Sequence, residues 1–391
     1  MITISLSPNT EKDDILLALK LVFCRKKKGK AIKELEDKFK EYLGVKYAFS
    51  FNSGRSSLMA ILQSLDLKGD VLLQSFTCNA AANPIIWSGT NPVYQDCDEN
   101  TFNIGDIKRT DKSKIVMVQH TFGIPADITK VPSDLILIED CAHALGAEYN
   151  GKKVGTFGKA AFFSFSRDKI ISSVYGGMVV TNDDALAEKI KKFQEEIGYP
   201  SSWWILQQLL HPLLMNWLIL PTYKLFIGKA ILVLSQWFHI LSKAVHWEEK
   251  QGIKPSYFPK RMPNALALLA LNQFKKLERF NNHRKEIANF YRQNLKGFTH
   301  PPEIEGSVYL RYPVKHPKAH EIIKKAWKKN ILIGDWYTNP VAPADTNLDK
   351  LKYTQCPNAE KLSKITLNLP THINISLKEA KTIVDFLNKL A

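Results

Sequence analysis

Lys169 lies in the stretch of the chain that is best suited to covalent chemistry. It ends the sequence Ser-Phe-Ser-Arg-Asp-Lys, which begins at Ser164 between two apolar runs, with the pair Gly176-Gly177 before the second run. The runs predict buried strands and the glycines predict a turn. Burial lowers the pKa of a lysine and leaves a nucleophilic amine, which can form a Schiff base with pyridoxal phosphate. Ser164 would then offer its hydroxyl to the cofactor phosphate. The alternative is a solvated loop lysine.

A second candidate is the segment Asn52–Ser57 (NSGRSS), which follows the strand pattern of Lys46–Phe51 and opens a helix. A glycine turn at a helix N-terminus presents free backbone N–H groups and the positive end of the helix dipole to an anion. Arg55 would add a full positive charge at the same place. The pattern predicts either a phosphate site or an ordinary helix capped by serine.

Asp140 is the third candidate, because it ends the apolar run Leu135–Asp140 and is followed by Cys-Ala-His143. A carboxylate at the end of a strand can pair with the protonated pyridine nitrogen of a pyridoxal cofactor. It can equally cap the next helix.

The elements that would position these residues alternate between strand and helix over the first half of the chain. Continuous apolar runs, such as 114–120 and 135–140, are typical of strands buried on both faces. We therefore predict an α/β fold with a largely parallel sheet wrapped by helices and ligands at the carboxyl ends of its strands. A long helix pattern over 264–295 leads into a smaller α/β domain, for which we expect strands at 308–312 and 331–334 and helices at 321–328 and 377–390.

Composition narrows the class of protein. A chain of 391 residues with 45% hydrophobic content can bury a large core and favours one large and one small domain. Its five cysteines include no CxxC pair, which argues for a reducing compartment and against disulfides or a structural zinc site, so no metal is expected. The N-terminus has no signal-peptide pattern, which favours the cytoplasmic side.

The net charge of +16, with a basic run at 25–30, suits binding to nucleic acid, to anionic lipid or to acidic substrates, or simply a solvated face.

The three candidates together resemble one family, the DegT/StrS-type aminotransferases, which use pyridoxal phosphate to aminate nucleotide-linked keto sugars. Their order and spacing are similar to the phosphate loop, the Asp motif and the Schiff-base motif of that family. The resemblance covers nearly the whole chain apart from one insertion. Further matching pieces are Gln74–Cys78, Val118–Gly123, Asn150–Gly155, Lys260–Asn264, Leu310–Pro313 and Asn368–His372.

The resemblance implies fold-type I architecture and a homodimer in which each active site is completed by the partner chain. It implies that Lys169 holds the cofactor and moves protons, that Asp140 holds the pyridine nitrogen and that His143 lies beside the ring. It assigns the phosphate to Ser164, Gly54, Arg55 and Ser56, makes Cys78 a further cofactor contact, and offers His120, Arg261 and Arg311 as substrate contacts. Arg311 could also be a surface arginine.

Four positions depart from the family pattern. Arg55 stands where the family usually has Thr, Cys78 where an aromatic ring is common, and Tyr175 where an acid is common. Pro259 replaces an Asn that normally reaches the phosphate of the neighbouring subunit. We hypothesise that Arg55 offsets the missing Asn, because a charged donor to phosphate is stronger than a neutral one.

The insertion is strongly apolar between Trp203 and Leu241, where the only Lys, Arg, Asp or Glu residues are Lys224 and Lys229. It forms two apolar arms, 203–220 and 223–241, hinged at Pro221-Thr222, with tryptophans near both ends. Three interpretations are open: a monotopic hairpin on an anionic membrane surface, a transmembrane hairpin, or a helix pair buried against the enzyme or its dimer partner.

We expect three regions: a large cofactor-binding domain at 1–196, the apolar insertion at 197–255, and a connecting helix with the small domain at 256–391. The predicted function is transfer of an amino group, from glutamate, to a nucleotide- or polyprenyl-linked keto sugar at the cytoplasmic face of the cell membrane. One alternative is the same chemistry on a soluble nucleotide sugar, with the insertion used for oligomer packing. Another is a non-catalytic binding protein on this scaffold. Nucleic acid is not expected as a partner, because no nucleic-acid-binding motif is evident.

Overall fold

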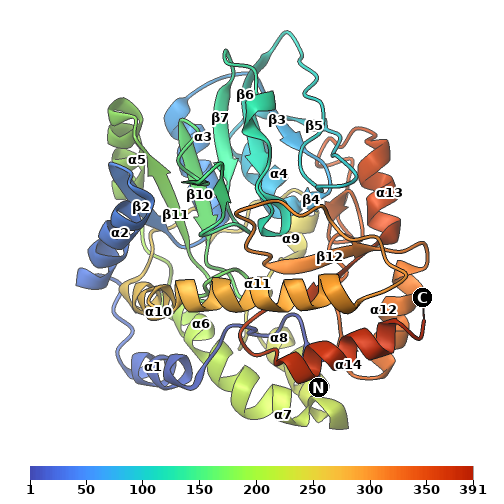
Figure 1. Cartoon of the computed structure of the whole chain (residues 1–391). Helices are drawn as coiled ribbons and strands as arrows, with labels where there is room; N and C mark the ends of the chain where they lie inside the picture. Colours follow the sequence, from blue (N-terminus) through green and yellow to red (C-terminus); the bar gives the residue numbers. More distant parts are fainter. Residues whose placement is uncertain (391) are drawn as a thin grey trace.

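A seven-stranded sheet positions the candidate residues in the computed structural model, which describes residues 1–390 (Figure 1). Only β11 runs antiparallel to its neighbours, and the other strand pairs are parallel, which confirms the largely parallel sheet. The strands lie in the order β2 (Tyr47–Phe51), β11 (Gly177–Thr181), β10 (Ala160–Ser164), β7 (Ile136–Asp140), β6 (Ser113–Gln119), β3 (Asp70–Gln74) and β5 (Asn91–Gln95).

Both faces of this sheet are buried, as the continuous apolar runs predicted. Side chains of β10 alternate between two cores: Phe162 joins the core beneath α3, and Phe163 joins the core beneath α2. The helices of this part are α2 (Lys30–Leu43), α3 (Gly54–Leu65), α4 (Asn79–Trp87) and α5 (Asp184–Glu196).

The C-terminal part is a smaller α/β unit, and it differs from the prediction in two places. The helix pattern of 264–295 forms two helices, α10 (Asn264–Phe274) and α11 (Leu277–Asn294), because the chain turns where Lys276 pairs with acidic residues of the N-terminal segment. The strand expected at 308–312 begins only at Arg311, since Tyr309 has a positive φ. The other elements are α12 (Ala319–Lys328), β12 (Arg311–Lys315), β13 (Ile331–Leu332), β14 (Val341–Ala342), α13 (Pro357–Ile365), β15 (Thr366–Pro370) and α14 (Leu377–Leu387).

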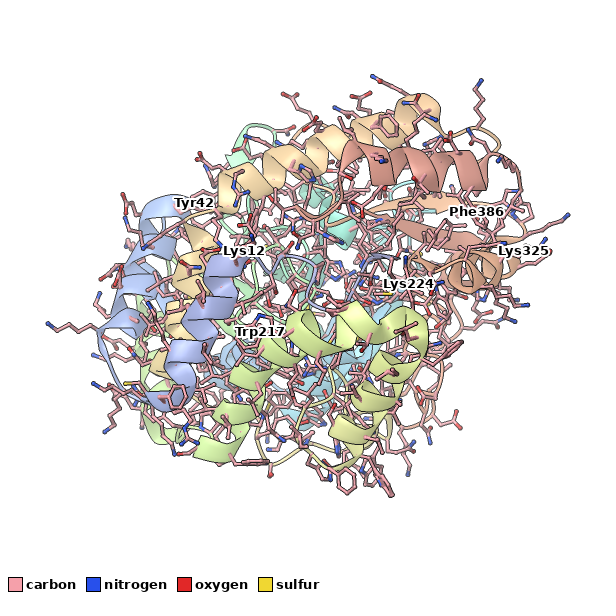
Figure 2. The ribbon with its side chains drawn as sticks, turned by 90° about the horizontal axis from the view of Figure 1, so that it is seen from below. Lys12, Tyr42, Trp217, Lys224, Lys325 and Phe386 are labelled. Carbon is pink, nitrogen blue, oxygen red and sulfur yellow. The ribbon has the colours of Figure 1, made fainter. Side chains whose placement is uncertain are left out.

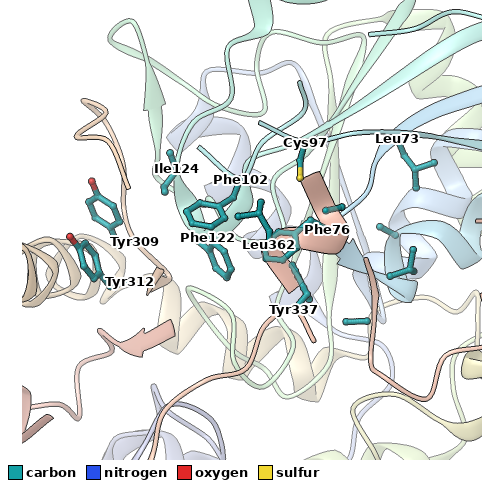
Figure 3. Close-up of a cluster of buried hydrophobic side chains, with 14 of the residues drawn as sticks. Leu73, Phe76, Cys97, Phe102, Phe122, Ile124, Tyr309, Tyr312, Tyr337 and Leu362 are labelled. Carbon is teal, nitrogen blue, oxygen red and sulfur yellow. The ribbon is translucent and has the colours of Figure 1, made fainter. Parts of the chain in front are cut away.

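The two parts share a hydrophobic core (Figure 3). Phe76 and Phe122 follow strands of the large sheet, and both pack against Tyr337 of the C-terminal part, with ring centroids 5.3 and 6.1 Å away. This packing holds the segment around Tyr337 against the carboxyl ends of the strands. The N-terminal strand β1 (Ile2–Thr3) pairs with β13, so the first residues also join the C-terminal part. The domain boundaries at 196 and 255 stay predictions.

The insertion forms a helical hairpin on one side of the molecule (Figure 2). Its first arm is α6 (Ser202–Leu214), which packs against α1 (Lys12–Phe23) and α10 and continues through the π-helical turn η3 (Met215–Ile219) into α7 (Leu220–Thr222). The chain then turns through η4 (Tyr223–Leu225), close to the predicted hinge, into α8 (Ile227–Trp237). Among residues 1–390, no helix has both the length and the apolar character needed to cross a membrane.

Short elements complete the chain. They are β4 (Thr77–Cys78), which pairs with β14, the hairpin of β8 (Glu148–Tyr149) and β9 (Lys152–Lys153), the helix α9 (Trp247–Lys250), and the 3-10 turns η1 (Thr121–Gly123) and η2 (Ile128–Lys130).

Candidate active site

A cavity of about 270 Å³ lies at the carboxyl ends of β7 and β10. The start of α3, the beginning of α4, the loop after β10, and two segments from elsewhere in the chain form its walls. Ten of its lining residues carry the argument below: Ser53, Gly54, Arg55, Cys78, Asp140, His143, Ser164, Arg167, Lys169 and Trp336. Seven of the predicted site residues are therefore brought together.

The first turn of α3 reaches the cavity because Gly177 has no side chain. A Cβ at Gly177 would lie 2.5 Å from the carbonyl of Ser53 and 2.6 Å from the nitrogen of Gly54. Ser53 caps the helix by accepting from the backbone N–H of Ser56 at 3.0 Å. The N–H groups of Gly54 and Arg55 lie in the first turn, where a helix offers no carbonyl acceptor, so they are free for an anion.

Ser56 itself does not line the cavity. Its hydroxyl is fully buried and donates to Asn52 Oδ1 at 2.6 Å. The cap residue Ser53 takes the position in the wall that we predicted for Ser56. The role of Ser53 could have been predicted from the sequence, because serine is a preferred N-cap and Ser53 immediately precedes the helix.

Lys169 lies on the loop after β10, and its Nζ is 5.0 Å from the centre of the Trp336 ring. Burial lowers its pKa below the ordinary value for lysine, and nearby Asp168, Cys78 and Asp140 oppose that shift only in part. Because the neutral amine is the nucleophile, this environment favours covalent chemistry at Nζ.

Asp140 is the last residue of β7, and its carboxyl is buried. Burial raises its pKa to about 6, although the N–H of Ala142 donates to Oδ1 at 2.9 Å and Lys169 lies nearby. A buried carboxylate with one committed oxygen would be stabilised by a cation in the cavity. A protonated pyridine nitrogen is such a cation.

His143 forms a flat face of the cavity. Burial, with the charges of Lys169 and Arg311, lowers its pKa well below the ordinary value. Its Nδ1 accepts from the N–H of Phe122 at 3.2 Å, so the neutral ring carries its proton on Nε2. The ring lies 5.3 Å from that of Trp336 at an interplanar angle of 13°.

Trp336 is a site residue that the sequence analysis missed. The guanidinium of Arg311 lies 3.3 Å from the centre of its ring and pairs with Asp168 at 2.9 Å. Arg311 is 3% exposed and is thus not a surface arginine. Trp336 follows the predicted strand at 331–334, and only the packing of Tyr337 against the large domain brings it to the cavity.

Arg55 has a partner that the sequence did not reveal. Its Nε pairs with Glu249 Oε2 at 2.5 Å, and its Nη2 donates to the carbonyl of Ala244 at 3.0 Å. Burial is the largest single effect and lowers the pKa of Arg55, but Glu249 and weaker neighbouring groups together outweigh it and raise that pKa. The side chain that we expected to bind phosphate is thus already compensated within its own chain.

All three predicted substrate contacts, His120, Arg261 and Arg311, lie outside the set of residues that line the cavity. His120 is fully buried, accepts from the N–H of Ala126 on Nδ1, and faces Glu139 at 3.3 Å through Nε2. Arg261 stacks on Tyr199, with 5.0 Å between guanidinium and ring centre. His120 directly follows β6 and contacts Glu139 of β7, so it joins the ends of these two strands.

His120, Glu139 and Cys141 lie close enough together to hold a metal ion. However, Glu139 already accepts from three backbone N–H groups, those of Gly155, Phe157 and Gly158, at 2.7 to 2.8 Å. Because the histidine lone pair is also used, this cluster is better explained as a structural hydrogen-bond network.

The donor set of the cavity fits pyridoxal phosphate. It offers a buried amine on Lys169, a carboxylate on Asp140 and, at a separate wall, a helix N-terminus with the hydroxyl of Ser164. Gly54 packs closely on Ser164, since a Cβ there would lie 3.1 Å from the serine Cβ. Cys78 lines the wall as a neutral thiol, because burial raises its pKa.

Comparison with known proteins is consistent with this geometry. The sequence pattern of the DegT/DnrJ/EryC1/StrS aminotransferase family matches residues 11–202 and 240–388. GDP-perosamine synthase of Escherichia coli O157:H7 is 28% identical over 376 residues, which cover 93% of this chain and 90% of that protein. The arms of the insertion lie almost entirely in the unmatched gap.

Solved structures share the fold. PseC of Helicobacter pylori, an aminotransferase involved in the biosynthesis of pseudoaminic acid, superposes with a TM-score of 0.76 at 24% identity, covering 99% of this chain and 98% of that chain. The putative sugar aminotransferase Spr1654 of Streptococcus pneumoniae, in its PMP form, superposes with a TM-score of 0.75 at 19% identity and covers 98% of both chains.

Proposed function

The chain belongs to the DegT/DnrJ/EryC1/StrS aminotransferase family, and from this premise we propose that it moves an amino group from glutamate to a keto sugar with pyridoxal phosphate as cofactor. The observation that carries the proposal is the convergence of Lys169, Asp140 and the first turn of α3 on one cavity. The acceptor is a nucleotide- or polyprenyl-linked sugar. A relative with 28% identity is named for a nucleotide sugar, GDP-perosamine, which supports this class.

Each of these residues would have a separate role in the reaction. Lys169 would hold the cofactor covalently and, once released, move a proton as acid and base, for which a lowered pKa is suited. Asp140 would hold the ring nitrogen, and the neutral imidazole of His143 would orient the ring. Pyridoxal phosphate supplies the electron sink for the exchange of the amino group. Arg311, which pairs with Asp168, donates to Asn368 Oδ1 and packs on Trp336 of the wall, would bind the carboxylate of the donor.

Absorption spectroscopy tests this proposal. Purified protein loaded with pyridoxal phosphate should show a visible band, and glutamate should bleach it. Lys169→Ala should not form the lysine-linked band, while Arg109→Gln, an exposed arginine paired with Asp134, should behave as wild type. A wild-type protein that never forms the band would refute the assignment of Lys169.

We further propose that the hairpin binds an anionic membrane surface. The second arm buries only Gly228 and Ser235 of α8, so most of its apolar side chains face outward. Phe226 and Trp237 are 73% and 71% exposed, and Lys224 is exposed close by (Figure 2). Exposed aromatic rings beside lysines suit the boundary between lipid headgroups and acyl chains, and the net charge of +16 adds attraction. The first arm, in contrast, packs on the enzyme.

Vesicle sedimentation tests the location. Vesicles with phosphatidylglycerol should bind the protein at least tenfold more tightly than vesicles of phosphatidylcholine alone. Phe226→Glu and Trp237→Glu should abolish most of that binding, and Trp327→Glu on α12 should not. Equal binding by all variants would refute the proposal.

The same exposed side chains could instead serve an interface between copies, which the resemblance to homodimers suggests. In that case wild type would fail to bind vesicles. In sedimentation equilibrium, the Phe226→Glu and Trp237→Glu variants would then have a smaller mass than wild type. That result would favour a soluble nucleotide sugar as acceptor.

A further inference from the structure

Arg55 and Arg167 line the cavity, Arg311 packs on the wall residue Trp336, and the charges of these three arginines are unequally compensated. Arg55 has the carboxylate of Glu249, and Arg311 has that of Asp168. Among residues 1–390, no carboxylate oxygen lies within 4.0 Å of the Arg167 guanidinium. Arg167 is therefore the arginine of the cavity whose positive charge has no carboxylate partner, and an anionic ligand would compensate that charge.

Arg167 is also held in one orientation. Its Nη2 donates to the carbonyl of Ser242 at 2.7 Å and to its hydroxyl at 2.5 Å. That hydroxyl in turn donates to Gln208 Oε1 on α6 at 2.7 Å. The guanidinium lies 5.7 Å from the ring centre of Tyr175, whose own hydroxyl donates to the carbonyl of Lys243. One edge of the guanidinium is thus fixed by the segment that leaves the hairpin.

The rest of the guanidinium makes no hydrogen bond with the described residues. Nε is buried and has no hydrogen-bond partner among the described residues, and none of the described hydrogen bonds uses Nη1. An unpaired N–H in a buried guanidinium is costly unless a ligand completes it. Because Arg167 lines the cavity, that ligand is one that enters the cavity.

The chemistry next to Arg167 indicates what the ligand is. Arg167 lies on the loop after β10, three residues after Ser164, which is the last residue of that strand. Its anchor Ser242 lies two residues before Ala244, which holds Arg55 at the start of α3. Free N–H groups, the hydroxyl of Ser164 and an uncompensated guanidinium thus belong to one wall of the cavity. Such a set matches the oxygens and the double negative charge of a phosphate monoester.

We propose that Arg167, oriented by Ser242, binds the phosphate of the cofactor, and that Arg55 has mainly a structural role in its ion pair with Glu249. This inference rests on the proposed function and identifies a binding residue that replaces the role hypothesised for Arg55. It also gives the insertion a second role, which is to orient Arg167, because Gln208 lies on α6 and Ser242 lies on the segment after α8.

Binding of pyridoxal phosphate and of pyridoxal, which lacks the phosphate, to the cofactor-free enzyme tests the proposal. Both aldehydes react with Lys169, so the ratio of their dissociation constants isolates the phosphate contribution. Arg167→Gln should weaken pyridoxal phosphate roughly 10- to 100-fold, the usual contribution of hydrogen bonds to a charged group. It should leave pyridoxal binding unchanged. Visible absorption during titration gives both constants without measuring activity.

Two more conservative variants should weaken the binding of pyridoxal phosphate by smaller amounts. Arg167→Lys keeps the charge but not the planar geometry, so its ratio should lie between those of wild type and Arg167→Gln. Ser242→Ala keeps the carbonyl acceptor and should weaken pyridoxal phosphate only a few-fold. Arg109→Gln is the matched control and should not change either constant.

Two results would overturn the inference. The first is an unchanged dissociation constant for pyridoxal phosphate in Arg167→Gln, which would mean that the phosphate does not touch Arg167. The second is equal weakening of both aldehydes, which would reveal a purely structural role. In either case wild type would still bind pyridoxal phosphate, so the proposed function would stand. Failure of wild type to bind would instead refute the proposed function.

Discussion

At the residue scale, the cavity shows how burial rather than residue type sets reactivity. Lys169 and Asp140 have opposite ordinary charges, yet burial pushes both towards their neutral forms. Neutrality helps the lysine, because its free amine is the nucleophile. For Asp140 it means that the ionised carboxylate is unfavourable until a cation arrives, and the cofactor nitrogen is suited to be that cation.

Asp140→Asn should therefore stabilise the cofactor-free protein at pH 7.5. The folded pKa of Asp140 is about 6, above its unfolded value of 3.8, so wild type loses stability as pH rises through this interval. The variant escapes that loss, which amounts to up to about 3 kcal/mol at about 1.4 kcal/mol per pKa unit. Urea unfolding at pH 7.5 and 4 measures it. A difference between the two proteins that is the same at both pH values would contradict the raised pKa.

At the element scale, the helix N-terminus and the loop of Lys169 are brought together by a strand that carries no chemistry. β11 lies between β2 and β10, and its first residue, Gly177, lets the turn before α3 touch the sheet. The glycine pair that looked like a turn in the sequence is required for this close approach.

Gly177→Ala should consequently weaken phosphate binding and destabilise the protein. The new Cβ would meet backbone atoms of Ser53 and Gly54 that cannot move independently, and overpacking of this kind costs about 1–3 kcal/mol. Thermal unfolding and a pyridoxal phosphate titration measure both effects. Gly198→Ala is the control, because nothing lies within 4 Å of a Cβ there. Identical behaviour of the two variants would refute the explanation.

At the scale of the whole molecule, the N-terminal segment connects the C-terminal part to the reactive loop. Asn9 is buried and accepts from the fully buried Arg284 at 2.7 Å, and its amide donates to the carbonyl of Ile170, next to Lys169. Burial lowers the pKa of Arg284 to about 9, so its charged form depends on these few acceptors.

Asn9→Ala should thus destabilise the protein by about 1–3 kcal/mol, the cost of leaving a buried charged donor without its acceptor. It should also speed hydrogen exchange in peptides that span 165–175. Asn294→Ala, at an exposed asparagine of α11, should change neither quantity. Faster exchange in both variants, or in neither, would contradict the connection.

The sequence by itself determined the local parts of this protein. Strand, turn and helix at 47–65, the strand ending at Asp140, and the loop of Lys169 follow from short-range apolar patterns and backbone requirements. The same patterns indicated Gly54 and Ser164 as site residues, and the family resemblance added His143; all three lie in the cavity wall. They also located the apolar hairpin and the turn between its arms.

Only the tertiary structure decided which distant residues meet at the cavity. Trp336 reaches it through aromatic packing between the two parts, Glu249 compensates Arg55, and Ser242 orients Arg167. It also removed His120 from the wall by giving it Glu139 as an internal partner. The hydrogen bond between Arg167 and Ser242 joins residues 75 positions apart, and the partners Arg55 and Glu249 are farther apart still. Contacts at such separations leave no mark on local periodicity. For that reason the sequence gives the chemistry of each group, and the folded chain determines which of them remain free to bind a ligand.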